Sequence, residues 1–199
     1  DHMGRYAFGN QPSITKWNLA RFAECLLTLI NPKKDESVKI ATEVIDKFDR
    51  QYEEKWFGMM KNKLGLIGDD KNDKVLIFEL LDYMKEQGLD YTNTFCFLMN
   101  QEIDNKKDYQ NDKFNNWKMK WQKRLTNDSE KLMKHNNPKI IPRNHNVESV
   151  LKSAEDNDLS PFNDLLEALK NPYTDPKVLS KYQSPPPKSD EKYQTFCGT

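Results

Sequence analysis

Residues 74 to 99 of this 199-residue chain read KVLIFELLDYMKEQGLDYTNTFCFLM. One apolar stripe in this stretch recurs every three to four residues, the spacing of one face of an α-helix, and comprises Ile77, Leu80, Leu81 and Met84. Gly88 is the expected end of that helix, with Leu89 folding back onto Met84 as in a Schellman motif. Asp90 then begins a second helix that we expect to continue through Met99. This stretch therefore predicts two consecutive helices.

The same helical period continues on both sides of this stretch. Before it, Leu19, Phe22, Ala23 and Leu26 form one stripe, and a long helix is predicted from about Glu36 to Lys63 on the stripe Ala41, Ile45, Phe48, Tyr52 and Trp56. After it, the stripes are Phe114, Trp117, Trp121 and Leu125, then Val147, Val150, Leu151 and Ala154, and finally Phe162, Leu165, Leu166 and Leu169. The side chains expected to be mostly buried are Trp17, Phe22, Leu26, Phe48, Trp56, Leu80, Leu81, Trp117, Leu151 and Leu165. No strand pattern of useful length occurs, so we predict an all-α fold with about eight helices.

Turn residues divide the chain into three predicted segments. Residues 1–12 form an entry turn, with Pro12 and the candidate N-cap Ser13 marking the first helix. Residues 13–182 form the helical domain, in which the polar stretch from Asp104 to Asp112 is expected to be a loop. Residues 183–199 form a tail that the triple proline at 185–187 should hold extended.

Composition excludes several classes of protein. Thirty-one basic residues balance thirty-one acidic ones, so no net charge draws the chain to nucleic acid or to an anionic membrane. No apolar run approaches the roughly 20 residues of a membrane span. Three cysteines, without a C-x-x-C pair, argue against a disulfide framework or a zinc site and favour a reducing compartment, so we expect a soluble cytoplasmic protein. The chain opens on Asp1-His2-Met3, and we expect it to be a fragment of a longer protein.

Few residues suggest chemistry of their own. The segment from Gly4 to Gly9 lacks the spacing of a phosphate-binding loop, so a turn entering a helix is favoured, although Arg5 could bind a phosphate. Trp17 and Arg21 lie one helical turn apart and could form a structural cation–π pair. The three histidines are isolated in polar sequence and favour surface positions.

Two charged stretches have structural explanations. The acidic residues Asp69, Asp70 and Asp73 lack the glycine and glutamate of a calcium loop, so helix capping is favoured over metal binding. Lysines interleave with aromatic residues from Phe114 to Arg124 at the spacing of an ordinary amphipathic helix, which is favoured over a nucleic-acid surface.

The cysteines differ in their expected access to solvent. Cys25 and Cys96 lie in apolar helical sequence and should be buried. Cys197 follows the triple proline and should be exposed, mobile and the only readily reactive thiol, which makes it a redox candidate.

Several segments, in order, resemble the SelO/YdiU family. The first is Gly4-Arg5-Tyr6-Ala7-Phe8-Gly9-Asn10-Gln11-Pro12, followed by Trp17-Asn18-Leu19-Ala20-Arg21. Next come Asp90-Tyr91-Thr92-Asn93-Thr94-Phe95, then Asn137-Pro138-Lys139 with Arg143-Asn144, and the ending with Asn171-Pro172-Tyr173 and Cys197. Cys96 departs from the family, in which arginine is common at that position.

The resemblance implies the C-terminal helical part of a protein-kinase-like fold, with residues 1–12 resembling an activation segment. It implies that the full-length parent is a nucleotidyltransferase, a pseudokinase that uses ATP and Mg²⁺ to transfer AMP to hydroxyl side chains of protein substrates. In the family the catalytic, nucleotide-binding and metal-binding residues precede the Gly4-Arg5-Tyr6 segment, so none is assigned here and no cofactor is expected in this chain. A missing N-terminal lobe is the expected partner, and Gly4–Ile30 should expose apolar surface without it. The resemblance also implies a redox role for Cys197, whose partner cysteine would lie upstream.

The sequence therefore leaves a leading function, an alternative from another class, and a third that is least supported. The chain is expected to be the structural and regulatory C-terminal region of a protein adenylyltransferase and to be inactive alone. The alternative is a free-standing helical module that binds another protein, and a nucleic-acid-binding domain is the third and least supported reading.

Overall fold

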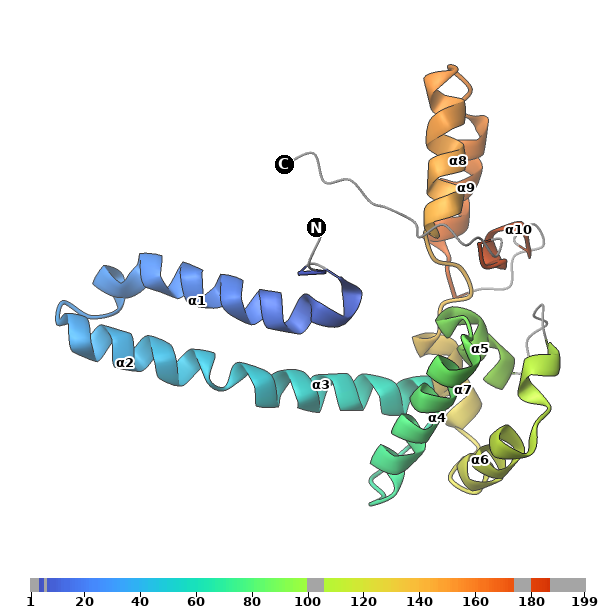
Figure 1. The fold of residues 1–199 in the computed structure, drawn as a ribbon, viewed down its shortest axis with the longest axis horizontal. Helices are drawn as coiled ribbons and strands as arrows, with labels where there is room; N and C mark the ends of the chain where they lie inside the picture. The colour runs from blue at the N-terminus through green and yellow to red at the C-terminus, as the bar shows by residue number, and fades with distance from the viewer. Residues whose placement is uncertain (1–3, 6, 100–105, 174–179, 187–199) are drawn as a thin grey trace. The chain divides into compact units, whose positions relative to one another are not determined.

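A computed structural model describes residues 4–5, 7–99, 106–173 and 180–186, and every element in these ranges is a helix (Figure 1). The predicted all-α class is therefore confirmed. The helices fall into two compact units, residues 1–59 and 60–199. None of the described helices combines the length and the apolar character that a bilayer span requires.

The first unit is built around a pair of neighbouring helices. The 3-10 turn η1 (Phe8–Asn10) leads into α1 (Gln11–Ile30), which packs along α2 (Lys34–Ile45) (Figure 1). The buried hydroxyl of Ser37 in α2 donates a hydrogen bond to the Leu27 carbonyl at the end of α1. This contact fastens the two helices together where the chain turns from one to the other.

The predicted single helix from Glu36 to Lys63 is wrong, because the chain breaks it into α2 and α3 (Phe48–Lys63). At the break the Lys47 amide bonds to the Val44 carbonyl at 3.2 Å, three residues back instead of four. Such a tightened last turn ends one helix and redirects the next. The apolar period continues across the break, which is why it could not be found from the spacing.

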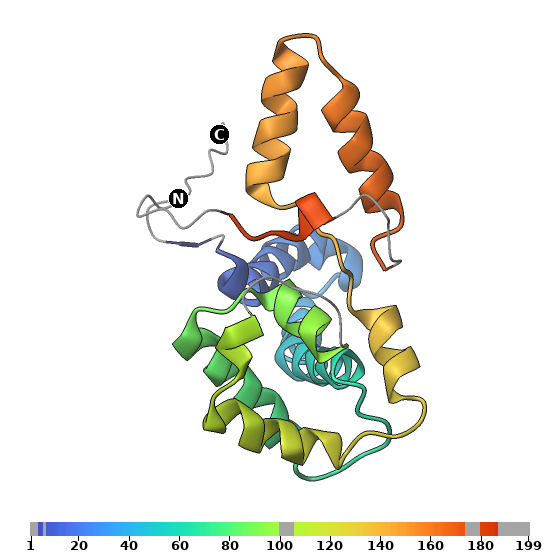
Figure 2. The same cartoon turned by 90° about the vertical axis from the view of Figure 1, so that its right-hand side faces the viewer.

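The second unit contains the remaining helices. They are α4 (Asp73–Gln87), α5 (Tyr91–Leu98), η2 (Lys106–Tyr109), α6 (Asp112–Gln122), α7 (Ser129–Asn136), α8 (Asn144–Glu155), α9 (Ser160–Lys170) and α10 (Ser180–Gln183). Figure 2 shows α8 and α9 as an antiparallel hairpin, and α4 packs against α6. Part of the expected loop between Asp104 and Asp112 is the turn η2.

The junction of α4 and α5 forms as predicted. Gly88 has a φ of 61°, a left-handed conformation that favours glycine, and the Leu89 amide bonds back to the Met84 carbonyl at 2.9 Å. The Asp90 carboxylate accepts a 2.8 Å hydrogen bond from the Asn93 amide and so caps α5.

The core of the second unit is largely aromatic. Phe114, Trp117 and Trp121 of α6 are buried as predicted, with the indole rings of the two tryptophans stacked 5.6 Å apart. Both indole N–H groups are satisfied, since Trp117 donates to the Leu76 carbonyl at 2.9 Å and Trp121 to the Leu64 carbonyl at 2.8 Å. A smaller cluster joins the α8–α9 hairpin to α10 and comprises Ile140, Val150, Leu165, Ala168 and Tyr182.

Burial divides the ten side chains that were expected inside. Leu80, Trp117 and Leu165 are buried, and Leu26, Phe48, Trp56 and Leu81 are half-buried. Trp17, Phe22 and Leu151 are exposed, so the prediction is wrong for these three. Their helical spacing is correct, but a stripe is buried only where a neighbouring element covers it.

The helix α7 was missed because its sequence carries only two adjacent large apolar residues, Leu132 and Met133. Its position depends on Ser129, whose buried hydroxyl donates to the Gly65 carbonyl at 2.6 Å and accepts from the Thr126 amide at 2.8 Å. Gly65 has a φ of 69°, and a Cβ there would lie 2.9 Å from the Ser129 carbonyl oxygen. A close backbone approach of this kind leaves no periodic trace in a sequence.

Candidate functional site

The N-terminal motif folds as a turn entering a helix. Gly4 has a φ of 64°, and its carbonyl accepts hydrogen bonds from the Ala7 amide at 3.0 Å and from Asn10 Nδ2 at 2.7 Å. Pro12 then occupies the first turn of α1, where its missing N–H costs nothing. The predicted turn entering a helix is therefore confirmed.

The predicted pair of Trp17 and Arg21 is confirmed and gains a third member. The Arg21 guanidinium lies 5.6 Å from the centre of the indole, and the Arg5 guanidinium lies 4.9 Å from it. All three side chains are exposed, so each contact contributes about 0.5–1 kcal/mol. Arg5 and Arg21 thus both contact the Trp17 ring.

The other residues of this motif do not converge on the stack. Gln11 and Asn18 are exposed on α1, and Tyr6 lies outside the described residues. The N-terminal motif belongs to the first unit, whereas Arg143 and Asn144 belong to the second.

In the second unit, Arg143 brings two of the later motif segments together. This residue precedes α8, is 8% exposed, and donates from Nη1 to Asp90 Oδ2 at 2.6 Å and from Nη2 to Asp90 Oδ1 at 2.9 Å. Nη2 also donates to Asn93 Oδ1 at 3.2 Å. The guanidinium of Arg143 therefore binds Asp90, the residue that caps α5, through two parallel hydrogen bonds. Asn144 begins α8 and is exposed.

The ion pair determines the protonation of Asp90. Burial alone would raise the pKa of this carboxyl, but the hydrogen bonds from Arg143 and the Asn93 amide, together with the charge of Arg143, hold it below its ordinary value. Asp90 is therefore an ionised structural group at neutral pH and is unsuited to general acid catalysis.

Lys63 joins the same region from the end of α3. Its Nζ donates to the Asn136 carbonyl at 3.2 Å and to Asn137 Oδ1 at 3.1 Å, and it lies 4.8 Å from the centre of the Phe95 ring. The Asn137 amide returns a 2.8 Å hydrogen bond to the Lys63 carbonyl. Burial lowers the pKa of Lys63, an effect that the neighbouring Cys96 opposes.

Cys96 lies in this region and is buried as predicted, with its Sγ 3.8 Å from the Pro138 carbonyl oxygen. Burial raises the pKa of the thiol to about 11, although Lys139, Lys63 and Arg143 work against this rise. A thiol that is both buried and protonated is a poor nucleophile. Cys25, in contrast, is exposed, so its predicted burial is wrong, and Cys197 lies outside the described residues.

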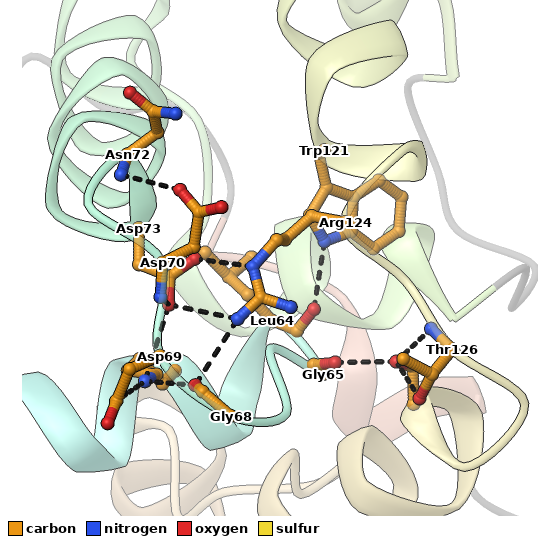
Figure 3. A network of polar contacts seen from close by, with 12 residues as sticks. Leu64, Gly65, Gly68, Asp69, Asp70, Asn72, Asp73, Trp121, Arg124 and Thr126 are labelled. Atoms are coloured by element: carbon orange, nitrogen blue, oxygen red, sulfur yellow. Dashed lines mark hydrogen bonds and ion pairs between the residues drawn. The ribbon is translucent and has the colours of Figure 1, made fainter.

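A second polar network surrounds Asp73 at the start of α4 (Figure 3). Arg124 Nε lies 2.8 Å from Asp73 Oδ1, and Arg124 Nη2 lies 3.2 Å from Oδ2 and 3.2 Å from the Gly68 carbonyl oxygen. Lys61 Nζ lies 3.3 Å from Asp73 Oδ2 and 2.6 Å from Asp69 Oδ1. Two cations therefore neutralise the buried Asp73.

The prediction that these acidic residues cap a helix is only partly right. The Asp73 carboxylate accepts a 3.2 Å hydrogen bond from the Asp70 amide, but its main partners are Arg124 and Lys61. Neither partner was identified from the sequence, since no local spacing relates Asp73 to an arginine 51 residues later. Within the described ranges, no three acidic, histidine or cysteine side chains are grouped to hold a metal ion.

Two lysines of α6 pair with acidic residues of α4, and the aromatic residues of α6 face inward. Lys120 lies 2.9 Å from Glu79 Oε1, and Lys113 pairs with Glu86. These pairs border two surface hollows of about 420 and 310 Å³ between α4 and α6. The predicted amphipathic helix is confirmed, since Phe114, Trp117 and Trp121 are buried.

Comparison with known proteins gives a consistent result. The profile of the family described as "Protein adenylyltransferase SelO" matches residues 1–170. A protein of Pelagibacter ubique named "Protein nucleotidyltransferase YdiU" is 56% identical over 205 residues, which cover 100% of this chain and 42% of the relative. Proteins of the same name from Clostridium perfringens and Alcanivorax borkumensis are 47% and 45% identical over the whole chain. The chain thus spans less than half the length of these relatives.

Proposed function

The chain belongs to the SelO family of protein adenylyltransferases, and on that premise we propose that it is the helical C-terminal region of a longer enzyme of this class. The longer enzyme transfers AMP from ATP to hydroxyl side chains of protein substrates. The described residues contribute a folded support to which the catalytic part is attached.

The arrangement around Arg143 carries the proposal. Segment 90–95 lies more than 40 residues before segments 137–139 and 143–144. Even so, Arg143 binds Asp90 and Asn93, and the Pro138 carbonyl oxygen lies 3.8 Å from Sγ of Cys96, the residue after segment 90–95. Asp90 is ionised and held by Arg143, and Cys96 is buried and protonated. Polar groups that are occupied by contacts within the protein stabilise its fold, whereas a catalytic group must be able to exchange a proton or form a bond with a substrate.

The carboxylate of Asp73 does not fit a site for Mg·ATP. A magnesium ion shared with phosphates needs carboxylates that are available for coordination, and the buried carboxylate of Asp73 is occupied by Arg124 and Lys61. We propose that ATP and Mg²⁺ bind the part of the longer enzyme that this chain lacks.

Cys197 remains the redox candidate of the proposed enzyme, on the strength of the family resemblance alone. The proposed location is the cytoplasm, where a reducing environment would keep the three thiols reduced.

The test uses ATP labelled at the α-phosphate and, separately, ATP labelled at the γ-phosphate. We expect the longer enzyme to transfer the α-label to protein, and the 199-residue chain to transfer neither label above a heat-denatured control. Transfer of the γ-label would show a kinase instead. Transfer of the α-label by the 199-residue chain alone would show that the chain contains the catalytic groups.

A free-standing protein-binding module is the second candidate, favoured by the exposed apolar side chains of α1. It predicts that the 199-residue chain by itself binds a separate protein, and that the longer enzyme binds the same protein with equal affinity. Binding of this kind, together with a longer enzyme that transfers neither label, would favour this second function.

A further inference from the structure

The α8–α9 hairpin of the second unit carries more apolar side chains than its two helices bury (Figure 2). Val150 of α8 and Leu165 of α9 are buried in the cluster that joins the hairpin to α10. Leu159, Phe162 and Leu166 recur at intervals of three and four residues and are 57%, 41% and 43% exposed, and we call these three the α9 row. An apolar arc of this width requires cover from a further surface.

The hairpin is also acidic. Residues 144–170 contain six acidic and two basic side chains, and all six acidic side chains are exposed. Glu155 ends α8 and Asp156 is its C-cap, so both carboxylates lie at the negative end of the helix dipole, where they lower stability. Among the ion pairs of the described residues, none involves Glu155 or Asp156. These two carboxylates are therefore open to a partner with positive charge.

The charge of the hairpin restricts what can cover the α9 row. A surface without cations would bury carboxylates unpaired, which is strongly unfavourable. A second copy of the chain would present the same acidic hairpin. Residues 1–59 carry nine basic and nine acidic side chains, and residues 100–105, 174–179 and 187–199 also lack an excess of positive charge. The complementary surface must therefore supply its own cations.

The mixture of apolar and charged side chains indicates a contact that forms and separates. Permanent interfaces are mainly apolar and depleted of charge, whereas transient interfaces are more polar. The α9 row, which begins directly after the acidic turn between α8 and α9, matches the transient kind. For an enzyme that modifies other proteins, the protein substrate is the partner that binds and leaves.

We propose that the α8–α9 hairpin is a docking site for protein substrates, and that it recognises a segment in which basic and apolar side chains alternate at helical spacing. The inference rests on the proposed function and deepens it, because it assigns a class of substrate. The apolar side chains of the segment cover the α9 row, and its lysines or arginines pair with Glu155 and Asp156. This charge pairing selects substrates and speeds their encounter with the enzyme.

The first test measures binding in the absence of ATP. The probe is a fluorescent synthetic peptide in which leucine and lysine alternate at helical spacing, and two comparison peptides carry glutamate for lysine or alanine for leucine. In fluorescence anisotropy, the 199-residue chain and the longer enzyme should bind the leucine–lysine peptide equally, less tightly at high salt, and the comparison peptides at least about tenfold less tightly.

Three results of this test would overturn the proposal. The first is that the 199-residue chain does not bind the leucine–lysine peptide. The second is equal affinity for all three peptides, which would show non-specific association. The third is binding by the 199-residue chain but not by the longer enzyme, which would show that the additional part of the enzyme covers the α9 row.

A pair of double variants locates the charge contact. Glu155→Gln with Asp156→Asn removes two charges from the hairpin, and Glu53→Gln with Glu54→Gln removes two exposed charges from α3. The hairpin variant should bind the leucine–lysine peptide at least about fivefold less tightly, and the α3 variant should bind it as the unchanged chain does. Equal effects of the two double variants would contradict a site on the hairpin.

A second pair of variants locates the apolar contact. Phe162→Ser should weaken binding at least about tenfold, whereas Met119→Ser, at an exposed position on α6, should leave it unchanged. If Phe162→Ser lowers the thermal midpoint, Leu159→Ser takes its place, because Leu159 is more exposed. Unchanged binding by the hairpin variant would overturn the proposal.

The last test connects docking with the proposed reaction. The leucine–lysine peptide has no hydroxyl side chain to accept AMP, and at saturation it should inhibit transfer of the α-label from ATP to protein by the longer enzyme. Full transfer in the presence of saturating peptide would overturn the proposal. Peptide binding at the hairpin of a longer enzyme that transfers no α-label would instead refute the proposed function, so the two failures are distinguishable.

Discussion

Replacing Asp90 tests whether the Arg143 cluster holds the second unit together. Asp90→Ala removes two interactions, the cap of α5 and the paired carboxylate of Arg143. Asp90→Asn removes mainly the second, because asparagine caps helices as well as aspartate does. The difference between the two variants therefore separates the cap from the charge.

The structure sets the size of each effect. Loss of an N-cap costs about 1 kcal/mol. Removing one partner of a buried pair costs about 3–5 kcal/mol, and we take the lower figure because the Asp90 side chain is 22% exposed. We expect Asp90→Asn to lower the free energy of unfolding by about 3 kcal/mol and Asp90→Ala by about 4 kcal/mol.

Urea unfolding is the assay, followed by the fluorescence of Trp117 and Trp121, which are both buried in the second unit. Trp17 and Trp56 are first replaced by phenylalanine, so that the signal reports this unit alone. Asp69→Asn is the control, since Asp69 also pairs with a lysine but is fully exposed, and it should leave the unfolding midpoint unchanged.

The double variant Asp90→Asn with Arg143→Met provides the cross-check. It should lose less stability than the sum of the two single variants, since neither buried charge is then left alone. If Asp90→Asn unfolds within about 0.5 kcal/mol of the unchanged protein, or if the effects of the two single variants simply add, the cluster does not stabilise the unit as argued.

The remaining predictions concern pH, backbone and thiol. The pKa of Asp90 is held below its ordinary value near 4, so the stability that its ionised form contributes should be complete above about pH 4 and fade at lower pH. The difference in the free energy of unfolding between the unchanged protein and Asp90→Asn, measured in urea, should therefore become smaller below about pH 4. Gly65→Ala should lower the free energy of unfolding by about 2–4 kcal/mol, because a Cβ would press against the Ser129 carbonyl. Gly88→Ala, whose Cβ would meet no neighbour, should lower it by about 1 kcal/mol. Equal losses of stability for the two variants in thermal unfolding would contradict the close approach at Gly65. Cys96 should react with a thiol reagent at pH 8 at least about 100-fold more slowly than Cys25 until the chain is unfolded, and fast labelling of Cys96 in the folded chain would be inconsistent with its burial.

Local features were predicted well from the sequence. The ending at Gly88, the cap at Asp90, the stacking of Arg21 on Trp17 and the inward face of α6 all depend on residues within one or two helical turns of one another. Interactions over such short separations are determined by helical geometry, which the spacing of side chains records directly.

Contacts between distant residues were not predictable in the same way. The motif segments 90–95, 137–139 and 143–144 were recognised as family-like, but nothing in their spacing indicated that Arg143 would bind Asp90 or that Asn137 would bind Lys63. The pairing of Asp73 with Arg124 was missed for the same reason. Such pairs depend on how helices pack, and many packings are compatible with one set of helices.

The sequence by itself therefore determined that the chain is helical, where α4 ends and α5 begins, and which face of most of the predicted helices is apolar. Only the tertiary structure decided which of those faces are covered. Leu80 and Trp117 carry stripes that meet a neighbouring helix and are buried, whereas the stripe of Phe22 on α1 has the same spacing and is exposed. The physical reason is that a helical period is a property of one segment, while burial requires a second surface to displace the water.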